Sequence, residues 1–356
     1  MRAPVRVAAA QFAVPPFDTD AGVEKVCDVL VAASHKGAEL VVFPETFLGG
    51  YPYWRGHVSV SQETELAARL WEVSVSADGA QVETIARTVL ETGVGAVVGA
   101  NERDERPGSG TAFNSQLFFT PGEGYVGTHR KLIPTHTERA YWGAGSASDL
   151  RVIQYPFAAV GGLICYEHHV LAARLALALA GEQIHCAAWP GYWETGRHIA
   201  DKVPGPATHH GEIDAVVRDY ALSTQSFVVS ANAYLPPRMI PPDLAGIMKY
   251  NLARGGSAIV DPSGRYLAGP AIDEDTLMLA DCDPADRAIA KAYLDTIGHY
   301  ARWDIFEFRV REQHADPDVS PMRLTDRSGD VPTETTLATG DKEQATTAGG
   351  TDGRNE

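Results

Sequence analysis

The sequence predicts an α/β fold in which apolar strands alternate with amphipathic helices. An apolar segment at 5–14 precedes a helical pattern at 18–35, and a second apolar segment then ends at Glu45. The same order returns later, where the apolar segment 152–164 precedes 170–180, a run of Leu and Ala with one Arg. Repetition of strand, helix and strand indicates parallel strands joined by right-handed crossovers.

The other elements are predicted from the same two periodicities. Further strands are expected at 93–100, 114–120, 125–131, 184–189, 227–233, 257–260 and 276–282, and further helices at 63–91, 208–224 and 283–294. The first of these helices is expected in two pieces, because Asp78 and Gly79 interrupt it. The segment 101–109 is expected as a charged loop. The pattern itself leaves open whether the strands form a doubly wound sheet or a sandwich of two sheets.

Composition and charge restrict the partners. The net charge of −16 disfavours nucleic acid and anionic membranes, whereas a neutral small molecule is compatible with it. No apolar run approaches the ~20 residues that a membrane-spanning helix needs. The four cysteines are widely spaced and form no CxxC pair, so neither a disulfide framework nor a zinc site is expected. We therefore expect a cytoplasmic protein with reduced thiols.

The sequence contains no motif for a metal or a cofactor. His136, His168, His169, His209 and His210 follow no HExxH spacing, and packing or surface roles are the commoner interpretation of such residues. Nucleotide-binding loops of the GxGxxG and Walker types are absent from the sequence, as is the GxSxG elbow of serine hydrolases. We expect an activity without metal or cofactor.

Three polar residues each follow an apolar strand. Cys165 lies between the strand 152–164 and the helix 170–180, where the positive end of a helix dipole would favour the nucleophilic thiolate. Glu45 ends a strand, at the edge where open α/β sheets place their chemistry, and Lys131 ends another. Each residue alone also has an ordinary interpretation: Cys165 as a buried thiol, Glu45 as a solvated carboxylate and Lys131 as a charge in a loop. The combination favours a catalytic site.

The sequences around these three residues resemble the nitrilase superfamily. Phe-Pro-Glu at 43–45, Arg-Lys-Leu-x-Pro-Thr at 130–135 and Cys-x-Glu at 165–167 carry the resemblance, which extends from about Val5 to about Phe308. It implies a four-layer α-β-β-α sandwich in a carbon–nitrogen hydrolase domain at 1–308. It leaves 309–356 as an extension, expected to be mostly disordered from about 317, because that part has no aromatic residue.

Two segments are similar to the nitrilase branch rather than to its amidase relatives. They are Gly-Tyr-Pro-Tyr-Trp at 50–54 and Pro-Thr-His-Thr-Glu-Arg at 134–139. Tyr166 departs from the Trp that nitrilases commonly carry after the nucleophile, which affects the expected substrate range more than the reaction. The resemblance implies hydrolysis of a small organic nitrile to a carboxylic acid and ammonia by a homo-oligomer, either a dimer or a larger spiral.

The resemblance also implies roles for individual residues. Cys165 would be the nucleophile, Glu45 the general base and Lys131 the group that stabilises and protonates the nitrile nitrogen. Glu138 would orient Lys131 or assist its proton transfers, although a salt bridge that only holds the loop is the alternative. The expected substrate-binding residues are Tyr51, Trp142, Tyr166, His168 and Trp189.

Three alternatives to a nitrilase stay open. The same triad also serves amidases and N-carbamoyl hydrolases, and cyanide is a further candidate substrate. A non-catalytic filament protein belongs to a different class. Ammonia release from a nitrile but not from the matching amide distinguishes the first group, and selective labelling of Cys165 by an electrophile distinguishes the last.

Overall fold

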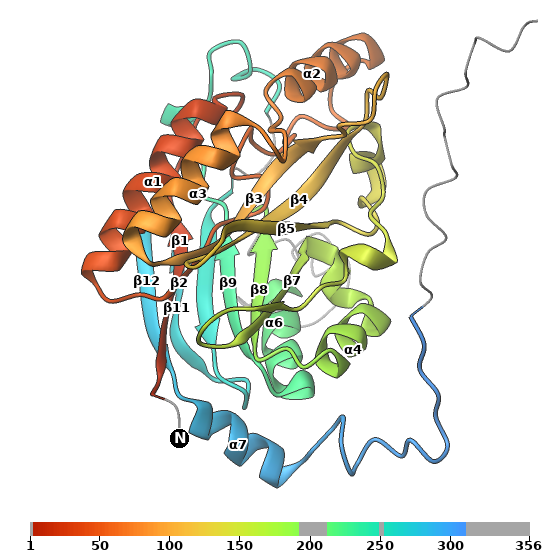
Figure 1. Ribbon diagram of the computed structural model, residues 1–356. Coiled ribbons are helices and arrows are strands. Elements are labelled where there is room, and N and C mark those ends of the chain that lie inside the picture. The colour runs from red at the N-terminus through yellow and green to blue at the C-terminus, as the bar shows by residue number, and fades with distance from the viewer. Residues whose placement is uncertain (1–2, 192–211, 249–252, 311–356) are drawn as a thin grey trace, which may run out of the picture. The chain divides into compact units, whose positions relative to one another are not determined.

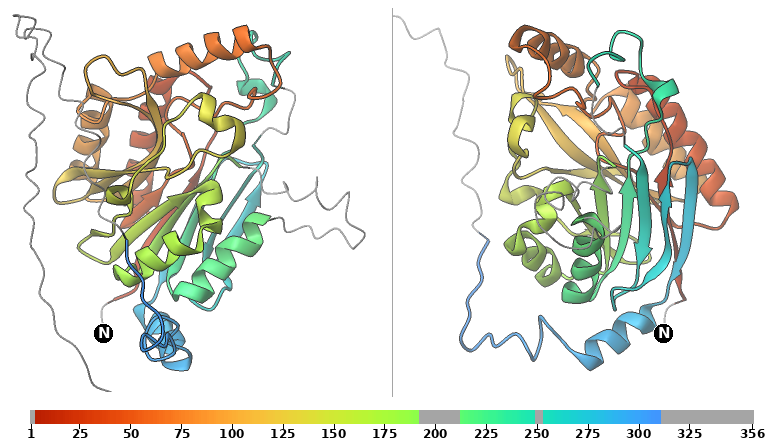
Figure 2. Two further views of the ribbon diagram at one scale, coloured as in Figure 1. Left: turned by 90° about the vertical axis from the view of Figure 1, so that its right-hand side faces the viewer. Right: turned by 180° about the vertical axis from the view of Figure 1, so that it is seen from behind.

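The computed structural model describes residues 3–191, 212–248 and 253–310. Two six-stranded mixed sheets pack face to face, and helices cover the outer face of each sheet (Figures 1 and 2). This arrangement confirms the four-layer α-β-β-α sandwich and rules out a doubly wound sheet. Apart from its first two residues, the extension expected at 309–356 lies outside the described residues.

The first sheet carries parallel strands at its centre. In spatial order its strands are β12 (Thr276–Cys282), β1 (Val5–Gln11), β2 (Leu40–Val42), β3 (Gly95–Arg103), β4 (Ala112–Thr120) and β5 (Gly124–Arg130). Strands β1, β2 and β3 are parallel, whereas β4 is antiparallel to both β3 and β5. Strand β5 therefore runs in the direction of β2, and the carboxyl ends of these two strands lie at the same edge of the sheet.

The second sheet repeats this plan. Its strands in spatial order are β11 (Tyr266–Ile272), β10 (Gly255–Val260), β9 (Phe227–Asn232), β8 (Ile184–Trp189), β7 (Ala159–Ile164) and β6 (Ile153–Gln154). Strands β7, β8 and β9 are parallel. Because Ile164 pairs with Ala188, the next residues of the two strands, Cys165 and Trp189, come at the same level of the sheet.

The core explains why the strands are apolar on both sides. In β1, Val7 and Ala9 belong to the cluster between the two sheets, whereas Ala8 and Ala10 belong to the cluster beneath the helices. Helices α1 (Thr19–His35) and α3 (Ala80–Thr92) cover the first sheet, and α4 (Leu171–Leu179) and α6 (Glu212–Thr224) cover the second (Figure 1). A strand covered on both faces reads as a continuous apolar run.

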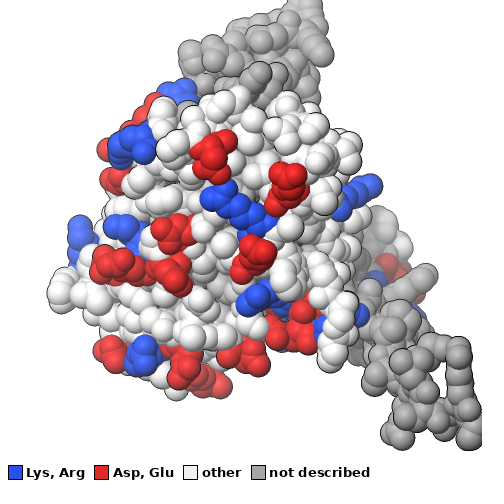
Figure 3. All heavy atoms as spheres, turned by 90° about the horizontal axis from the view of Figure 1, so that it is seen from above, with Lys and Arg blue, Asp and Glu red and all other residues white. Residues whose placement is uncertain are grey.

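Two further helices complete the described part of the chain. Helix α2 (Val60–Glu72) is the first piece of the helix expected at 63–91, and α3 is the second. Helix α7 (Pro284–Tyr293) follows β12. Within the described residues, no helix combines the length and the apolar composition that crossing a membrane requires. On the face shown in Figure 3, acidic and basic side chains are interspersed rather than gathered by sign.

Three sequence predictions are wrong in detail. The single strand predicted at 152–164 is two antiparallel strands, β6 and β7, joined by the segment 155–158. Strand β3 continues through Arg103 into the segment expected as a loop, because Asn101 and Glu102 pair with β4 and are buried there. Strand β11 was not predicted, since its Gly269 and Pro270 are residues that strands normally exclude. It lies at the edge of its sheet, where a proline does not interrupt a ladder on both sides.

Candidate active site

Glu45 lies in the turn that follows β2 and is 2% exposed. Its Oε1 accepts hydrogen bonds from Nδ2 of Asn114 at 2.6 Å and from Nζ of Lys131 at 3.0 Å. Its Oε2 is buried and has no hydrogen-bond partner among the described residues. A Cβ at Gly99 on β3 would collide with the carbonyl of Pro44, so a glycine is needed where β3 passes this turn. One carboxylate oxygen of Glu45 is thus held, and the other is free to accept a proton.

Lys131 follows the last residue of β5 and is buried. Its backbone N–H donates to the carbonyl of Asn114 at 2.8 Å, which fixes the residue against β4. Its Nζ donates to Glu45 and also to Oε2 of Glu138 at 2.8 Å. Glu138 comes from the short 3₁₀ helix His136–Ala140. The ammonium therefore bridges two carboxylates from separate loops.

Glu138 is held by two further donors. The hydroxyl of Tyr51 donates to its Oε1 at 2.5 Å, and the N–H of Thr135 donates to its Oε2 at 2.7 Å. Glu138 is 1% exposed. In the described residues these bonds join Glu138 to Lys131 and not to Arg139, its neighbour in sequence. The alternative of a salt bridge that only holds the loop named Arg139 or Lys131 as the partner, and the partner in the described residues is Lys131.

The pKa values of the cluster follow from burial and from its single positive charge. Burial, together with the charge of Glu138, raises the pKa of Glu45 to about 7, against the opposing effects of the Lys131 ammonium and of the hydrogen bonds from Lys131 and Asn114. Burial also acts to raise the pKa of Glu138, but Lys131 and the hydrogen bonds outweigh it and lower that pKa. Burial alone would lower the pKa of Lys131, yet the nearby acidic groups raise it. Near neutral pH, Glu45 is the group whose proton is exchangeable.

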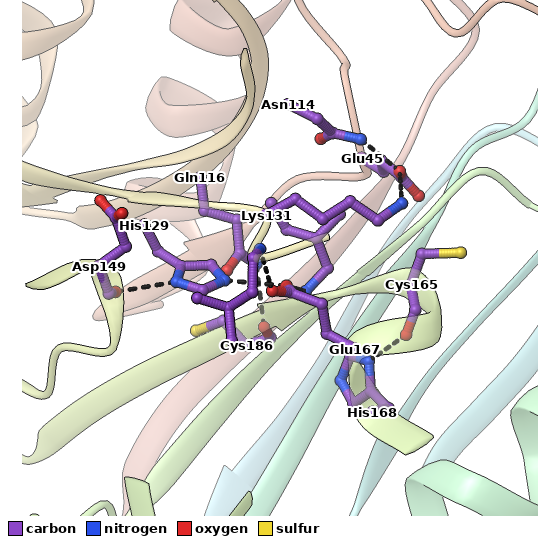
Figure 4. A network of polar contacts seen from close by, with 12 residues as sticks. Glu45, Asn114, Gln116, His129, Lys131, Asp149, Cys165, Glu167, His168 and Cys186 are labelled. Carbon is purple, nitrogen blue, oxygen red and sulfur yellow. Dashed lines mark hydrogen bonds and ion pairs between the residues drawn. The ribbon is translucent and has the colours of Figure 1, made fainter. Parts of the chain in front are cut away.

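Cys165 follows β7 directly, with its backbone in the left-handed region at a φ of 53°. A short 3₁₀ helix, Cys165–His169, separates it from α4, which begins only at Leu171. Burial and the charge of Glu45 raise the pKa of the Cys165 thiol well above its usual range, against the opposing effects of Lys131 and of a hydrogen bond from the N–H of Tyr166. This higher pKa contradicts the thiolate expected from the dipole of the following helix, so a base is needed to remove the proton. Figure 4 shows the Cys165 side chain together with those of Glu45 and Lys131.

The five expected substrate-binding residues lie in different settings. The hydroxyl of Tyr51 contacts Glu138, and Nε1 of Trp142 donates to Oδ1 of Asn101 at 2.8 Å. The ring of Trp189 stacks on that of His168 with centroids 4.6 Å apart. The hydroxyl of Tyr166 donates to Oε2 of Glu212 on α6 at 3.0 Å, and its side chain is 40% exposed. The other four side chains are buried.

Sequence reasoning missed Glu167, which joins the two loops of the site. Its Oε1 accepts from the N–H of Leu132 at 2.6 Å, and its Oε2 accepts from the N–H of Ile164 at 2.7 Å. Nε2 of His129 lies 2.9 Å from the same Oε2 (Figure 4). The backbone after Lys131 and the backbone before Cys165 are thus bound to one buried carboxylate. Glu167 belongs to the Cys-x-Glu motif, but the sequence does not reveal its partners.

In the described ranges, no three His, Cys, Asp or Glu side chains are grouped so as to hold a metal ion. His209 and His210 lie outside these ranges. What the described arrangement does contain is a thiol, a carboxylate with a free oxygen and a buried ammonium at the carboxyl ends of β7, β2 and β5. Such a set can perform nucleophilic attack, transfer of the thiol proton and stabilisation of negative charge.

Comparisons with known proteins agree with this set. The family model for carbon–nitrogen hydrolases matches residues 6–292. The chain is 34% identical over 329 residues to Nitrilase 2 of an unknown prokaryotic organism, covering 92% of this chain and 97% of that relative. It is 33% identical over 317 residues to an aliphatic nitrilase of Sinorhizobium fredii, covering 86% and 96%.

A solved structure shows the same fold. Nit3 of Saccharomyces cerevisiae, a member of branch 10 of the nitrilase superfamily, superposes with a TM-score of 0.64 at 16% identity, covering 86% of this chain and 98% of that one. At this identity the likeness concerns the fold alone. The family model and the two curated relatives carry the assignment further: the chain belongs to the carbon–nitrogen hydrolase family and, within it, to the nitrilases.

Proposed function

We propose that this nitrilase hydrolyses an organic nitrile to its carboxylic acid and ammonia, with Cys165 as nucleophile and Glu45 as base. The observation that carries the proposal is the free, buried Oε2 of Glu45 beside a thiol that is neutral at rest. A base whose pKa lies near 7 can both take and return a proton at neutral pH. The relatives named nitrilase support the choice of substrate class.

The first half of the proposed reaction forms a thioimidate. Glu45 takes the proton of the Cys165 thiol as the sulfur attacks the nitrile carbon, so that an S–C bond forms and one C–N π bond breaks. Negative charge then develops on the nitrile nitrogen. Lys131 stabilises this charge and protonates the nitrogen, and the N–H of Tyr166 is a second donor for it. Lys131 regains a proton from Glu45 through their 3.0 Å hydrogen bond.

The second half consumes two water molecules. Glu45 removes a proton from the first water, which adds to the thioimidate carbon, and protonation of the nitrogen releases ammonia and leaves a thioester. The second water is activated in the same way, releasing the carboxylic acid and restoring the thiol. Throughout, Glu138 holds Lys131 in its charged form and in position, which is the role that its three donors suit.

We also propose that the aromatic residues shape the substrate pocket. The polar atoms of Tyr51 and Trp142 are engaged with Glu138 and Asn101, so these side chains would offer the substrate mainly their ring faces. Trp189, level with Cys165 in the neighbouring strand, is the strongest candidate for direct contact, together with its stacking partner His168. Tyr166 would contribute its backbone N–H.

The setting of the enzyme is part of the proposal. All four cysteines are free thiols, which suits a reducing compartment such as the cytoplasm. The family resemblance favours a homo-oligomer, either a dimer or a larger spiral. Light scattering on the purified protein measures that assembly, and a monomer at micromolar concentration would contradict it.

The decisive experiment compares ammonia release from matched nitriles and amides. Aliphatic, aromatic and arylacetic nitriles, cyanide and the corresponding amides are tested with the wild type, with Cys165→Ala and with Cys186→Ala as a matched control for loss of a buried thiol. We expect ammonia from nitriles with the wild type and the control, and none with Cys165→Ala. Release from amides alone would indicate an amidase. Turnover by a folded Cys165→Ala protein would refute the nucleophile.

A further inference from the structure

A chain of buried hydrogen bonds leads from the carbonyl of Cys165 away from Glu45 and Lys131. Nδ1 of His168 lies 2.6 Å from the carbonyl oxygen of Cys165, and Nε2 of His168 lies 2.9 Å from Nε2 of His185 (Figure 4 shows the first link). Nδ1 of His185 lies 2.8 Å from Oε1 of Glu182, whose Oε2 accepts from the hydroxyl of Tyr220 at 2.6 Å. Both histidines, Glu182 and Tyr220 are fully buried.

When both histidines are neutral, hydrogen-bond chemistry fixes the direction of every proton in this chain. A carbonyl only accepts, so Nδ1 of His168 carries a hydrogen, and in the neutral ring Nε2 then accepts. His185 must donate from its own Nε2, which leaves its Nδ1 as an acceptor. The remaining donor is Oε1 of Glu182, which must therefore be a carboxylic acid. With all groups neutral, one arrangement satisfies every bond.

The surroundings favour this neutral arrangement. Burial raises the pKa of Glu182 to about 8, although the bond from Tyr220 and the charge of Arg287 oppose this. Burial lowers the pKa of both histidines well below its usual value, and the Arg174 guanidinium lowers both further. The titratable or charged groups that face the chain are His129, Glu167, His169, Arg174, Cys186, Asp219, Tyr220 and Arg287.

The first link of the chain controls a group that the proposed reaction needs. The carbonyl of Cys165 and the N–H of Tyr166 belong to one planar peptide and point in opposite directions. A bond that holds the carbonyl toward His168 therefore holds the N–H toward the sulfur, which it hydrogen-bonds. Holding is required, because the left-handed backbone of Cys165 is strained for a residue that is not glycine.

We infer that His168, His185 and Glu182 are positioning residues that hold the Cys165–Tyr166 peptide with its N–H toward the reacting sulfur and nitrile nitrogen, for as long as Glu182 carries its proton. When Glu182 ionises, the hydrogen of His185 is found on Nδ1 instead of Nε2. Nδ1 then donates to the carboxylate, and Nε2 no longer donates to His168. His168 then carries its hydrogen on Nε2, and the bare Nδ1 faces the carbonyl. One lost proton thus releases the peptide.

Gly161 on β7 provides the space that this chain occupies. A Cβ at this position would collide with Oε1 of Glu182, so any larger residue would displace the carboxyl group from His185. The glycine in an otherwise apolar strand thereby has a physical reason. The inference rests on the proposed function for the role of the Tyr166 N–H. The geometry of the hydrogen-bond chain does not depend on that function.

Glu182→Gln and Glu182→Leu test the inference. The amide of Gln donates to His185 and accepts from Tyr220 at every pH, whereas Leu has no carboxylate that could take the hydrogen of His185. We expect kcat of the wild type to fall about tenfold per pH unit above about pH 8, as a single ionisation requires. The Gln variant should keep the neutral-pH kcat and lose this decline. The Leu variant has no carboxyl group to ionise, so its kcat should lack the decline as well.

Alkylation of Cys165 by iodoacetamide, followed by mass spectrometry, separates failure of this inference from failure of the proposed function, because it needs no nitrile. Above about pH 8 the wild type should react more slowly than Glu182→Gln, since it alone loses the donor that stabilises the thiolate. Equal alkylation rates of the two proteins across pH 6–10, or the same alkaline decline of kcat in both, would overturn the inference. So would a folded Glu182→Leu protein that keeps the alkaline decline of kcat.

Discussion

Replacing Asn114 with Leu removes one of the two donors that hold Oε1 of Glu45 and leaves Lys131 in place. Asn114 is fully buried, and its Oδ1 has no hydrogen-bond partner among the described residues. Leu has a similar volume and also removes that unsatisfied acceptor. We therefore expect the variant to fold. The change isolates a single bond, from Nδ2 of Asn114 to Glu45 at 2.6 Å.

The size of the effect follows from the strength of that bond. A hydrogen bond to a charged group contributes about 1.5 to 3 kcal/mol, and one pKa unit corresponds to about 1.4 kcal/mol. Because the bond favours the ionised form, its loss should raise the pKa of Glu45 from about 7 by a further ~1 to 2. The base must be ionised to accept the thiol proton. Below pH 7, kcat/KM should thus fall ~10- to 100-fold relative to the wild type, and this ratio should recover as the pH rises.

The assay is ammonia release from one nitrile between pH 5.5 and pH 9.5, expressed as the ratio of variant to wild type. Gln116→Leu is the matched control, because Gln116 is equally buried on the same strand but donates to the carbonyl of Cys186 at 2.9 Å. The ratio of Gln116→Leu activity to wild-type activity should not depend on pH. If the ratio for Asn114→Leu were constant across the range, Asn114 would not act on the pKa of Glu45, and the electrostatic account of the base would be wrong.

Three further predictions concern stability and selectivity. Tyr51→Phe should lower the free energy of unfolding by about 1.5 to 3 kcal/mol in urea titrations, because the charged carboxylate of Glu138 loses one of its hydrogen-bond donors. Trp189→Phe should change kcat/KM by factors that depend on the size of the nitrile, while the rate of alkylation of Cys165 stays unchanged. The same fold-change for every nitrile would show that Trp189 is only a packing residue. Between pH 4.5 and pH 8 the wild type should lose up to ~5 kcal/mol of unfolding free energy that Glu182→Gln retains, because only the unfolded chain releases the Glu182 proton in this range. The same pH dependence of the unfolding free energy in both proteins, measured by urea titration, would contradict this.

Sequence patterns singled out the three proposed catalytic residues because each follows its own strand. An apolar run that stops at a polar residue indicates both the strand and its carboxyl end, and parallel strands bring these ends to one edge. Glu45, Lys131 and Cys165 carry this local signal. Asn114 and Glu167 do not: Asn114 lies 69 residues from Glu45, and Glu167 lies 35 residues from the backbone N–H of Leu132 that it binds. Such pairings depend on strand register, which the sequence alone leaves open.

The charge state of Cys165 shows why a local argument can mislead. Considered with its neighbours in sequence, the residue precedes a helix whose dipole favours a thiolate. In the folded chain the thiol is 3% exposed, and it also feels the charge of Glu45, which is 120 residues away in sequence. Burial disfavours the thiolate, and a neighbouring carboxylate disfavours it again. Both effects come from tertiary structure, so they could not be predicted from the segment itself.

The unequal surroundings of the two carboxylates are the reason that we propose Glu45 rather than Glu138 as the base. One buried ammonium can neutralise only one anion, so Glu45 and Glu138 compete for Lys131. Glu138 has two additional donors, the Tyr51 hydroxyl and the Thr135 N–H, whereas Glu45 has only the Asn114 amide. The anion therefore stays on Glu138, and the exchangeable proton belongs to Glu45. Its Oε2, which has no hydrogen-bond partner among the described residues, gives that proton a place to bind, so the same asymmetry accounts for both the Lys131–Glu138 ion pair and the pKa near 7 of the proposed base.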